Sequence, residues 1–194
     1  MKKILLTLAL GLGLLTANAQ IEKLAGPRIG FTYISEGPIA DFIHDGFDFD
    51  EDDKYGSTGA AFTSLYGWQW ESRFADGGNV TGIVEWIVLV GGMEKGMFLP
   101  SASSIIGARM DNRLEVGVGP NLSLSGIGMV FGVGYNFKSG NLNLPVSISF
   151  IPGRMKDGEI ETYNNTTDEY YYEEYEYNTG TRIAITLGFN MNRK

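Results

Sequence analysis

The chain contains no cysteine and only one histidine, and beyond its first 19 residues it has no run of about 18 apolar residues. The lack of cysteine excludes disulfides, so an exported chain must be stabilised otherwise, and a closed hydrogen-bonded barrel meets that need. The lack of a long apolar run excludes a transmembrane helix from this part of the chain. Basic residues are also scarce, because 15 Lys and Arg stand against 23 Asp and Glu, and this balance argues against nucleic acid as a partner.

The first 19 residues are predicted to form a secretory signal peptide. Lys2 and Lys3 precede an apolar segment at 4–15, and Ala17-Asn18-Ala19 supplies the small residues of a cleavage site. The apolar segment is short for a retained membrane anchor. We therefore expect cleavage after Ala19 and one folded domain over residues 20–194, which keeps 13 basic and all 23 acidic side chains once Lys2 and Lys3 are removed.

Large apolar residues alternate with small or polar residues through residues 112–150. In the middle of this stretch Ile127, Met129 and Phe131 share one rank, and Gly128 and Gly132 lie in the other. A period of two predicts β-strands whose two faces lie in different environments. Turn residues interrupt the pattern at regular intervals, so the stretch is predicted to hold consecutive antiparallel strands.

The composition of the second rank distinguishes two kinds of barrel. In a soluble barrel or sandwich the apolar rank would point inward, whereas in a membrane barrel it would meet lipid and the other rank would fill the lumen. A solvated strand face usually carries Lys, Glu, Thr and Arg, but this rank carries mostly Gly, Ser and Asn. Small residues suit a crowded interior, and Gly weakens an exposed strand. We therefore predict a membrane barrel, and we keep a soluble periplasmic barrel as the alternative.

Eight strands of membrane-spanning length are predicted. The fold class is therefore all-β: an eight-stranded antiparallel up-and-down transmembrane β-barrel with two long acidic external loops. The longest connections are residues 36–57 and 152–180, and several of the others are tight turns. Outer-membrane barrels have short periplasmic turns and longer external loops, so both termini are expected in the periplasm. The predicted strands are 28–35, 60–74, 80–91, 98–109, 113–122, 126–137, 141–150 and 181–192.

This combination of signal peptide, alternating strands and loop lengths resembles the small eight-stranded outer-membrane barrels of the OmpX and OmpA type. The resemblance covers nearly all of residues 20–194 and depends on the overall pattern, not on one diagnostic motif. It implies a location in the outer membrane of a double-membraned bacterium. It also implies contact with outer-membrane lipid and lipopolysaccharide.

Charged residues occur on the rank that should face the barrel interior. An eight-stranded barrel has an interior that side chains can fill. We predict that these charges pair with one another and plug the barrel, and a proton or ion path is the alternative. The residues are Arg28, Glu71, Arg73, Glu85, Arg109, Arg113, Glu115 and Arg182.

Sixteen of the 23 acidic residues lie in the two long connections, eight within 36–53 and eight within 157–176. The first and last strands are neighbours in a closed barrel, so these segments should lie side by side. Aromatic residues are interleaved with the acids, and residues 169–177 are predicted to extend the last two strands outward or to form an acidic tip. The segments indicate either solvated loops or an external surface for cations, cationic ligands or partner proteins. Residues selected for this surface are Asp53, Tyr170, Tyr172, Glu174 and Tyr175.

Asp48, Asp50 and Asp52 have the D-x-D-x-D spacing of a calcium loop. The match ends there, because Asp53 stands where an EF-hand needs Gly and Gly59 stands where it needs Glu. The spacing therefore predicts at most weak binding of Ca²⁺ or Mg²⁺ at the external loops, and no other cofactor is indicated.

No motif in the chain indicates a specific catalytic activity. His44 falls in a predicted loop and has no recognisable Ser partner, so the prediction is a protein that is not an enzyme. The favoured function is a plugged outer-membrane barrel whose acidic, Tyr-rich external loops serve surface interaction or envelope structure. The alternatives are a narrow pore or transporter of small solutes and a lipid A-modifying outer-membrane enzyme.

Overall fold

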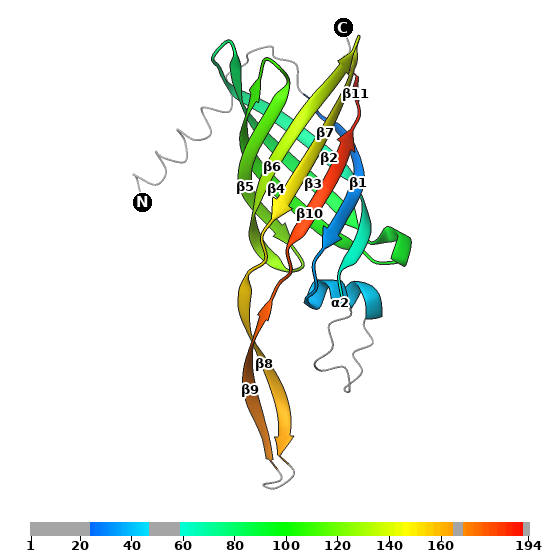
Figure 1. Cartoon of the computed structure of the whole chain (residues 1–194), viewed down its shortest axis with the longest axis vertical. Coiled ribbons are helices and arrows are strands. Elements are labelled where there is room, and N and C mark those ends of the chain that lie inside the picture. The colour runs from blue at the N-terminus through cyan, green and yellow to red at the C-terminus, as the bar shows by residue number, and fades with distance from the viewer. Residues whose placement is uncertain (1–23, 47–58, 165–168, 192–194) are drawn as a thin grey trace, which may run out of the picture.

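The computed structural model describes residues 24–46, 59–164 and 169–191. They form a closed barrel of eight antiparallel strands, with a two-stranded hairpin projecting from one end (Figure 1). The all-β class and the eight-stranded antiparallel barrel are therefore confirmed, while the predicted signal peptide lies outside the described residues. The barrel strands are β1 (Gly26–Ile34), β2 (Ala61–Asp76), β3 (Val80–Gly91), β4 (Leu99–Met110), β5 (Leu114–Ser123), β6 (Gly126–Ser139), β7 (Leu142–Ile151) and β10 (Arg182–Gly188), which β11 (Asn190–Met191) continues.

The last strand closes the ring. Strand β10 pairs with β1 on one side and with β7 on the other, and every remaining barrel strand pairs with its neighbours in chain order. The sequence predicts one continuous strand over 181–192, whereas the structure interrupts it at Phe189, whose N–H donates to the Pro27 carbonyl oxygen at 3.2 Å. A closed ring has no open sheet edge, so its backbone groups are satisfied without a neighbouring chain.

Alternate residues along the barrel strands have opposite exposures. The inward side chains of Glu71 and Ile83 are 3% and 1% exposed, whereas Phe31 and Ile106 on the outside are 71% and 61% exposed. Because strand side chains alternate between faces, this difference identifies the two ranks directly. Large apolar side chains therefore cover the outside of the barrel.

Strands β4 and β5 approach each other closely at Gly119. Their pairing runs from Ser101 to Ser103, skips two residues and resumes at Ile106, opposite Val118. Pro120 lies within the skipped part of β5, where its missing N–H cannot take part in the ladder. A Cβ atom at Gly119 would lie 1.8 Å from the Ser104 carbonyl oxygen, so a larger residue would force the two strands apart.

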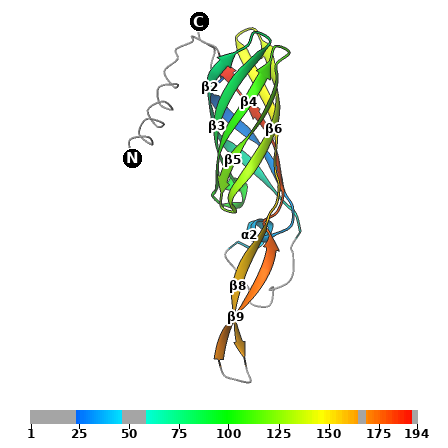
Figure 2. The same ribbon diagram turned by 90° about the vertical axis from the view of Figure 1, so that its left-hand side faces the viewer.

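The two ends of the barrel differ in their connections (Figures 1 and 2). At the turn end, short connections join β2 to β3, β4 to β5 and β6 to β7, and the described chain begins and ends there. At the hairpin end lie helix α2 (Pro38–Asp45), the 3-10 turn η3 (Met93–Lys95) and the hairpin of β8 (Met155–Asn164) and β9 (Glu169–Asn178). This hairpin places residues 169–177 in an extension beyond the barrel, which agrees with the first of the two alternatives that the sequence leaves open.

Helix α2 lies in a segment for which the sequence predicts only a loop. Pro38 begins the helix, where its fixed φ is favourable and its missing N–H costs nothing. The helix forms because its apolar residues gain a partner surface on β1, β2 and β4, which the local pattern does not reveal. The packed residues are Ile34, Ala40, Ile43 and Ala61, with Ile39, Met97 and Leu99 around them. In the part of the chain that the structure describes, no helix is long and apolar enough to span a membrane.

Candidate functional site

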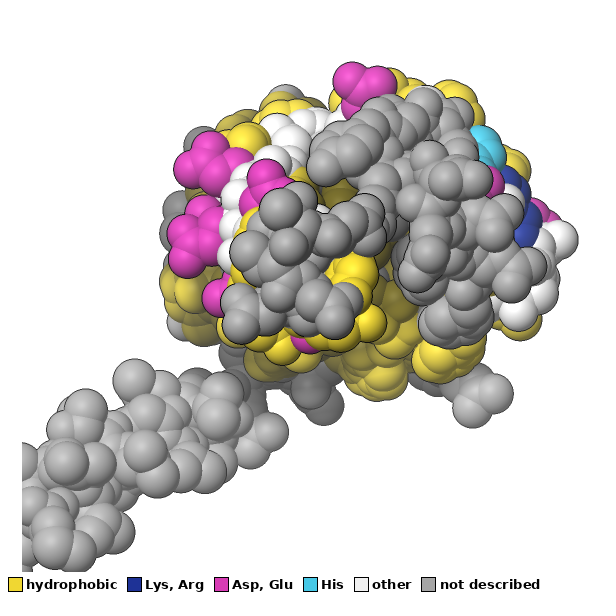
Figure 3. All heavy atoms as spheres, turned by 90° about the horizontal axis from the view of Figure 1, so that it is seen from below, with side chains coloured by type: hydrophobic (Ala, Val, Ile, Leu, Met, Phe, Trp, Pro, Cys, Tyr) yellow, Lys and Arg dark blue, Asp and Glu magenta, His cyan; other side chains and the backbone are white. Residues whose placement is uncertain are grey.

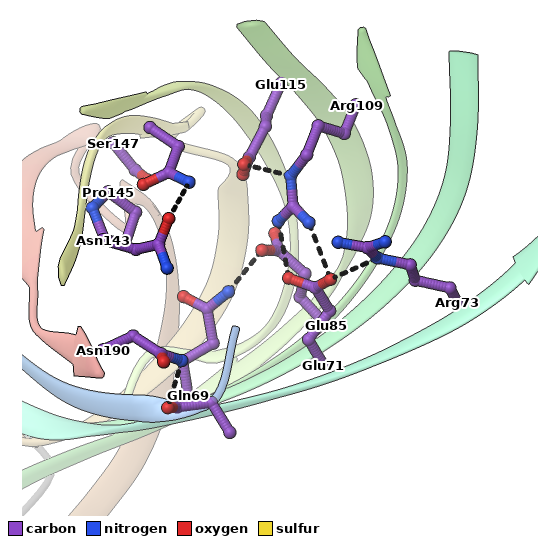
Figure 4. Close-up of polar contacts among 12 residues, drawn as sticks. Gln69, Glu71, Arg73, Glu85, Arg109, Glu115, Asn143, Pro145, Ser147 and Asn190 are labelled. Carbon is purple, nitrogen blue, oxygen red and sulfur yellow. Dashed lines mark hydrogen bonds and ion pairs between the residues drawn. The ribbon is translucent and has the colours of Figure 1, made fainter. Parts of the chain in front are cut away.

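Charged side chains meet across the barrel interior toward the turn end. Arg109 of β4 donates from Nη1 and Nη2 to the two carboxylate oxygens of Glu71 at 2.8 and 2.5 Å. Its Nε donates to Glu115 Oε1 at 2.5 Å, and Arg73 Nε donates to Glu71 Oε1 at 3.3 Å. The Glu71 side chain is 0% exposed. These contacts join β2, β4 and β5 across the interior (Figure 4).

A second series of hydrogen bonds runs beside the first through Gln69. Arg28 of β1 donates to the Gln69 side-chain oxygen, and the Gln69 amide donates to the Glu85 carboxylate of β3. Arg28 also donates to the Pro145 carbonyl oxygen at 3.0 Å, which ties β1 to β7. Arg28 and Gln69 are 2% and 1% exposed, so this series is buried like the first.

The two series together are called the polar layer. Its members are Arg28, Gln69, Glu71, Arg73, Glu85, Arg109 and Glu115. Three arginines face three glutamates, so the formal charge of the layer is zero. Beside it, Asn136 Nδ2 donates to Asn143 Oδ1 at 3.0 Å and supplies polar groups on the β6–β7 side. A balanced, hydrogen-bonded set can be buried where an unpaired charge could not.

Six of the eight charged residues that the sequence places in the interior lie in the polar layer, but the prediction is wrong for Arg113. That residue is exposed in the turn between β4 and β5, with φ 71° and its N–H donating to the Met110 carbonyl oxygen at 2.8 Å. Strand β5 begins one residue later, so the inward alternation does not include Arg113. Gln69, which the sequence analysis does not select, could be found because it lies two residues before Glu71 on the same rank.

Arg182 faces the interior at the hairpin end, away from the polar layer. Its Nη1 donates to Ser123 Oγ at 2.8 Å and its Nη2 to Asn121 Oδ1 at 3.2 Å. Both partners are neutral and belong to β5, so the side chain reaches across the interior from β10. Among the described residues, none of the three ion pairs includes Arg182, and its buried Nε has no hydrogen-bond partner. The expected pairing with a carboxylate is therefore wrong for this residue.

A cavity of about 130 Å³ occupies the hairpin half of the interior. Its lining runs from Glu85 and Glu115 in the polar layer to Arg182 and Ile39 at the hairpin end. The sequence predicts that mainly Gly, Ser and Asn face inward, but strands β1 to β4 present a wall of larger apolar side chains. These wall residues are Ile34, Leu65, Ile87, Leu89, Leu99 and Ile105. The interior is therefore polar toward one end and partly apolar toward the other.

The projecting hairpin has two unlike faces. Asp157 lies opposite Glu176, and Glu159 lies opposite Glu174, so like charges face each other across the two strands. Such pairs are unfavourable in an isolated hairpin. With Glu161, these four residues form the acidic face, because all of them lie on one side of the alternation. Acidic side chains gather around this end of the molecule in the view of Figure 3.

Tyrosine rings stabilise the hairpin and cover part of both faces. The rings of Tyr163 and Tyr170 have their centroids 4.9 Å apart, and Tyr175 covers Gly158, where a Cβ atom would lie 2.7 Å from the ring. All four described residues of the predicted external surface lie exposed on β9, namely Tyr170, Tyr172, Glu174 and Tyr175. Each strand of this two-stranded sheet has one edge with no partner strand among the described residues.

The predicted metal ligands Asp48, Asp50 and Asp52, together with Asp53, lie outside the described residues. Within residues 24–46, 59–164 and 169–191, no group of three or more His, Asp or Glu side chains is arranged to hold a metal ion. His44 lies on α2, and its Nε2 is 3.2 Å from the Ala60 carbonyl oxygen. This contact connects the helix with the residue that precedes β2.

Comparisons of the chain with protein-family models, with curated proteins and with solved structures gave no match. The geometry of the barrel, its interior and its hairpin is therefore the basis for the functional proposal.

Proposed function

We propose that the protein is a non-enzymatic outer-membrane barrel whose projecting hairpin binds partners at the cell surface. The observation that carries this proposal is the apolar outer surface. Between the ends of the eight barrel strands, no outward position is occupied by Asp, Glu, Lys or Arg. Phe31, Phe131 and Ile185 on different strands are 71%, 49% and 54% exposed. Apolar surface that is continuous around a whole barrel far exceeds the patches of soluble monomers and matches the lipid-facing band of membrane barrels.

The positions of the aromatic side chains also support membrane insertion. Trp70 and Phe74 lie in the half of β2 nearer the turn end, and Phe62 and Phe98 lie near the hairpin end. All four are at least 47% exposed. Aromatic residues concentrate at both interfaces of membrane barrels, so this distribution fits a band of lipid between the two ends.

The polar layer supports a structural role in preference to conduction. Its arginines and glutamates bond to one another directly or through Gln69, and the side chains of Glu71, Glu115 and Arg109 are only 0%, 7% and 10% exposed. Side chains of this size can fill an eight-stranded interior. The protein then resembles the small eight-stranded outer-membrane barrels in its interior as well as in its strand count.

The hairpin is proposed to face the outside of the cell and to bind a basic protein segment. Short turns face the periplasm in such barrels, which places the opposite end outside. The free edges of β8 and β9 offer main-chain hydrogen bonds to an added strand. The acidic face adds an attraction for Lys and Arg, and its like-charge pairs would be relieved when such side chains arrive.

Location is tested by expressing the full chain in a bacterium with an outer membrane and separating the cell fractions. We expect the protein in the outer-membrane fraction, with faster gel migration before boiling than after it. Protease added to intact cells should cut the hairpin and leave the barrel. Recovery as a soluble periplasmic protein would contradict the proposal, and steady single-channel currents in planar bilayers would favour the pore instead.

Partner binding is tested with the purified full chain and a synthetic strand-forming peptide of alternating Lys and Val. We expect binding that weakens steeply with salt and falls at least tenfold in the double variant Glu159→Gln, Glu174→Gln. The matched control is Asp111→Asn, because Asp111 is exposed at the turn end. Equal weakening in the control, or equal binding of a Glu–Val peptide, would show general charge attraction and not a site on the hairpin.

A further inference from the structure

The hairpin half of the interior combines a cavity, an apolar wall and the cation Arg182, which forms no ion pair with the described residues. The polar layer occupies the turn half of the interior. The larger apolar residues of β1 to β4 lie in the hairpin half and take no part in that layer. Among them, Leu65 and Ile105 are 7% and 6% exposed, so they are shielded from solvent while lining open space. An apolar wall beside a cavity favours an apolar ligand over water.

Arg182 supplies the opposite kind of group at the open end of this cavity. Two of its nitrogens bond to the neutral side chains of Ser123 and Asn121, and its buried Nε has no partner among the described residues. Two further basic residues lie nearby: the charge of Arg154 acts on Arg182, and Lys156 Nζ donates to the Ser125 carbonyl oxygen at 2.9 Å. Guanidinium groups bind carboxylates with strong, directed hydrogen bonds.

We infer that the cavity binds a medium-chain fatty acid, with its carboxylate on Arg182 and its alkyl chain against the apolar wall of β1 to β4. The Arg182 guanidinium has an Nε without a hydrogen-bond partner among the described residues, which could donate to one carboxylate. A cavity of about 130 Å³ suits part of one chain, because an engineered cavity of about 150 Å³ holds a benzene molecule. From Arg182 to Thr186, which also lines the cavity, the strand spans about 13 Å, so the chain has to be of moderate length.

This inference goes beyond the proposed function and does not depend on it, because the same cavity would exist in a soluble barrel. The polar layer sets the depth of the site. Glu85 and Glu115 lie at its inner limit, where an alkyl chain would meet carboxylates instead of apolar side chains. Longer fatty acids should therefore bind less well than octanoate.

The test uses the full chain folded in zwitterionic detergent and an octanoic acid that carries a diazirine at its tail. After photolysis, peptide mass spectrometry identifies the labelled residues. We expect labels on the inward residues Leu65, Ile87 and Ile105, and we expect unlabelled octanoate to compete at least tenfold better than octylamine. Labels confined to outward residues such as Phe131, or equal competition by octylamine, would overturn the inference.

Variants at the mouth separate the site from general lipid contact. Arg182→Met should reduce inward labelling at least tenfold, whereas Arg182→Lys should keep most of it. The control Lys138→Met removes an exposed charge at the turn end, far from Arg182, and should change labelling less than threefold. If Arg182→Met lacks the heat-dependent gel shift of a folded barrel, the variant cannot be used. The competition between octanoate and octylamine on the unaltered chain then tests whether the site prefers a carboxylate. Labelling that is competed only by a lysophospholipid would assign the cavity to a membrane lipid and overturn the fatty-acid site.

Discussion

The two halves of the barrel interior are lined by different kinds of side chain. The turn half holds three arginines and three glutamates that are bonded directly or through Gln69, and the hairpin half holds Ile and Leu side chains around a cavity. Both halves are built on the same eight strands with the same alternation. The comparison shows that a period of two determines which residues point inward, while the size and charge of those residues determine whether the interior is filled or left open.

The largest expected effect is in the polar layer, where Arg109→Met leaves Glu71 and Glu115 without their shared cation. Removing one member of a buried ion pair costs about 3–5 kcal/mol, so the free energy of unfolding in urea should fall by that amount. Arg73→Met is the matched control, since Arg73 lies at the rim and is 18% exposed. A loss of stability below about 1 kcal/mol for Arg109→Met would mean that the charged contacts of the turn half contribute little to stability.

A smaller loss is expected for Glu115→Ala. Arg109 keeps both hydrogen bonds to Glu71 in this variant, so only one charged contact is lost. The expected loss is about 1–3 kcal/mol, measured by the same urea unfolding. Unchanged stability would mean that Glu115 is not part of the layer in solution, and the interior at that point would be open to water.

Overpacking should be tolerated in one half and not in the other. Val130→Phe adds volume beside the cavity and should cost less than about 1 kcal/mol while blocking octanoate labelling. Asn136→Phe, on the same rank of β6, breaks the hydrogen bond to Asn143 and should cost about 1–3 kcal/mol. Equal losses would show that the cavity offers no spare room.

The smallest expected effect concerns Glu94, outside the barrel wall at the hairpin end. Partial burial acts to raise its pKa, but hydrogen bonds from the Ser64 hydroxyl and N–H hold the pKa of this carboxyl below its ordinary value. The ionised Glu94 carboxylate therefore stabilises the folded protein at pH values above the pKa that this group has in the unfolded chain. This stabilisation is lost as the pH falls through the lower pKa that the group has in the folded protein.

Glu94→Gln should consequently lower stability by at most a few tenths of a kcal/mol near neutral pH. The difference from the unaltered chain should shrink as the pH falls below the ordinary glutamate pKa of about 4.3. Unfolding curves at neutral pH and through the acid range check this, and a difference that does not shrink in acid would indicate that the carboxylate charge is not responsible.

Much of the barrel could be predicted because alternation is local and repeated. Residues 126–137 show it at every position except Val130, and strand β3 is predicted with its observed limits at Val80 and Gly91. Ile87 and Leu89 of the same strand also hint at the cavity, because they are large and apolar at inward positions. A single irregular strand does not show that Leu65 and Ile105 face the same space.

The features that could not be predicted depend on contacts between distant parts of the chain. Helix α2 is stabilised by Ile34 and Ala61 on the barrel, so its own sequence of eight residues gives little signal. The outward position of Arg113 follows from a turn with positive φ, which Gly or Asn would normally indicate. Arg182 forms no ion pair with the described carboxylates because of its height in the barrel, which alternation alone does not specify.

The polar layer has a consequence for how the barrel assembles. Arg28 of β1 bonds to Pro145 of β7 across the position of β10, and Arg109 of β4 bonds to Glu71 of β2 across β3. These partners belong to strands that are not neighbours, so they meet only when the sheet has curved fully. An open sheet would leave these side chains without their partners, and an unpaired charge that is shielded from water costs several kcal/mol. Ring closure and the bonding of the interior side chains must therefore occur together, so β10 has to join β1 before the interior is complete.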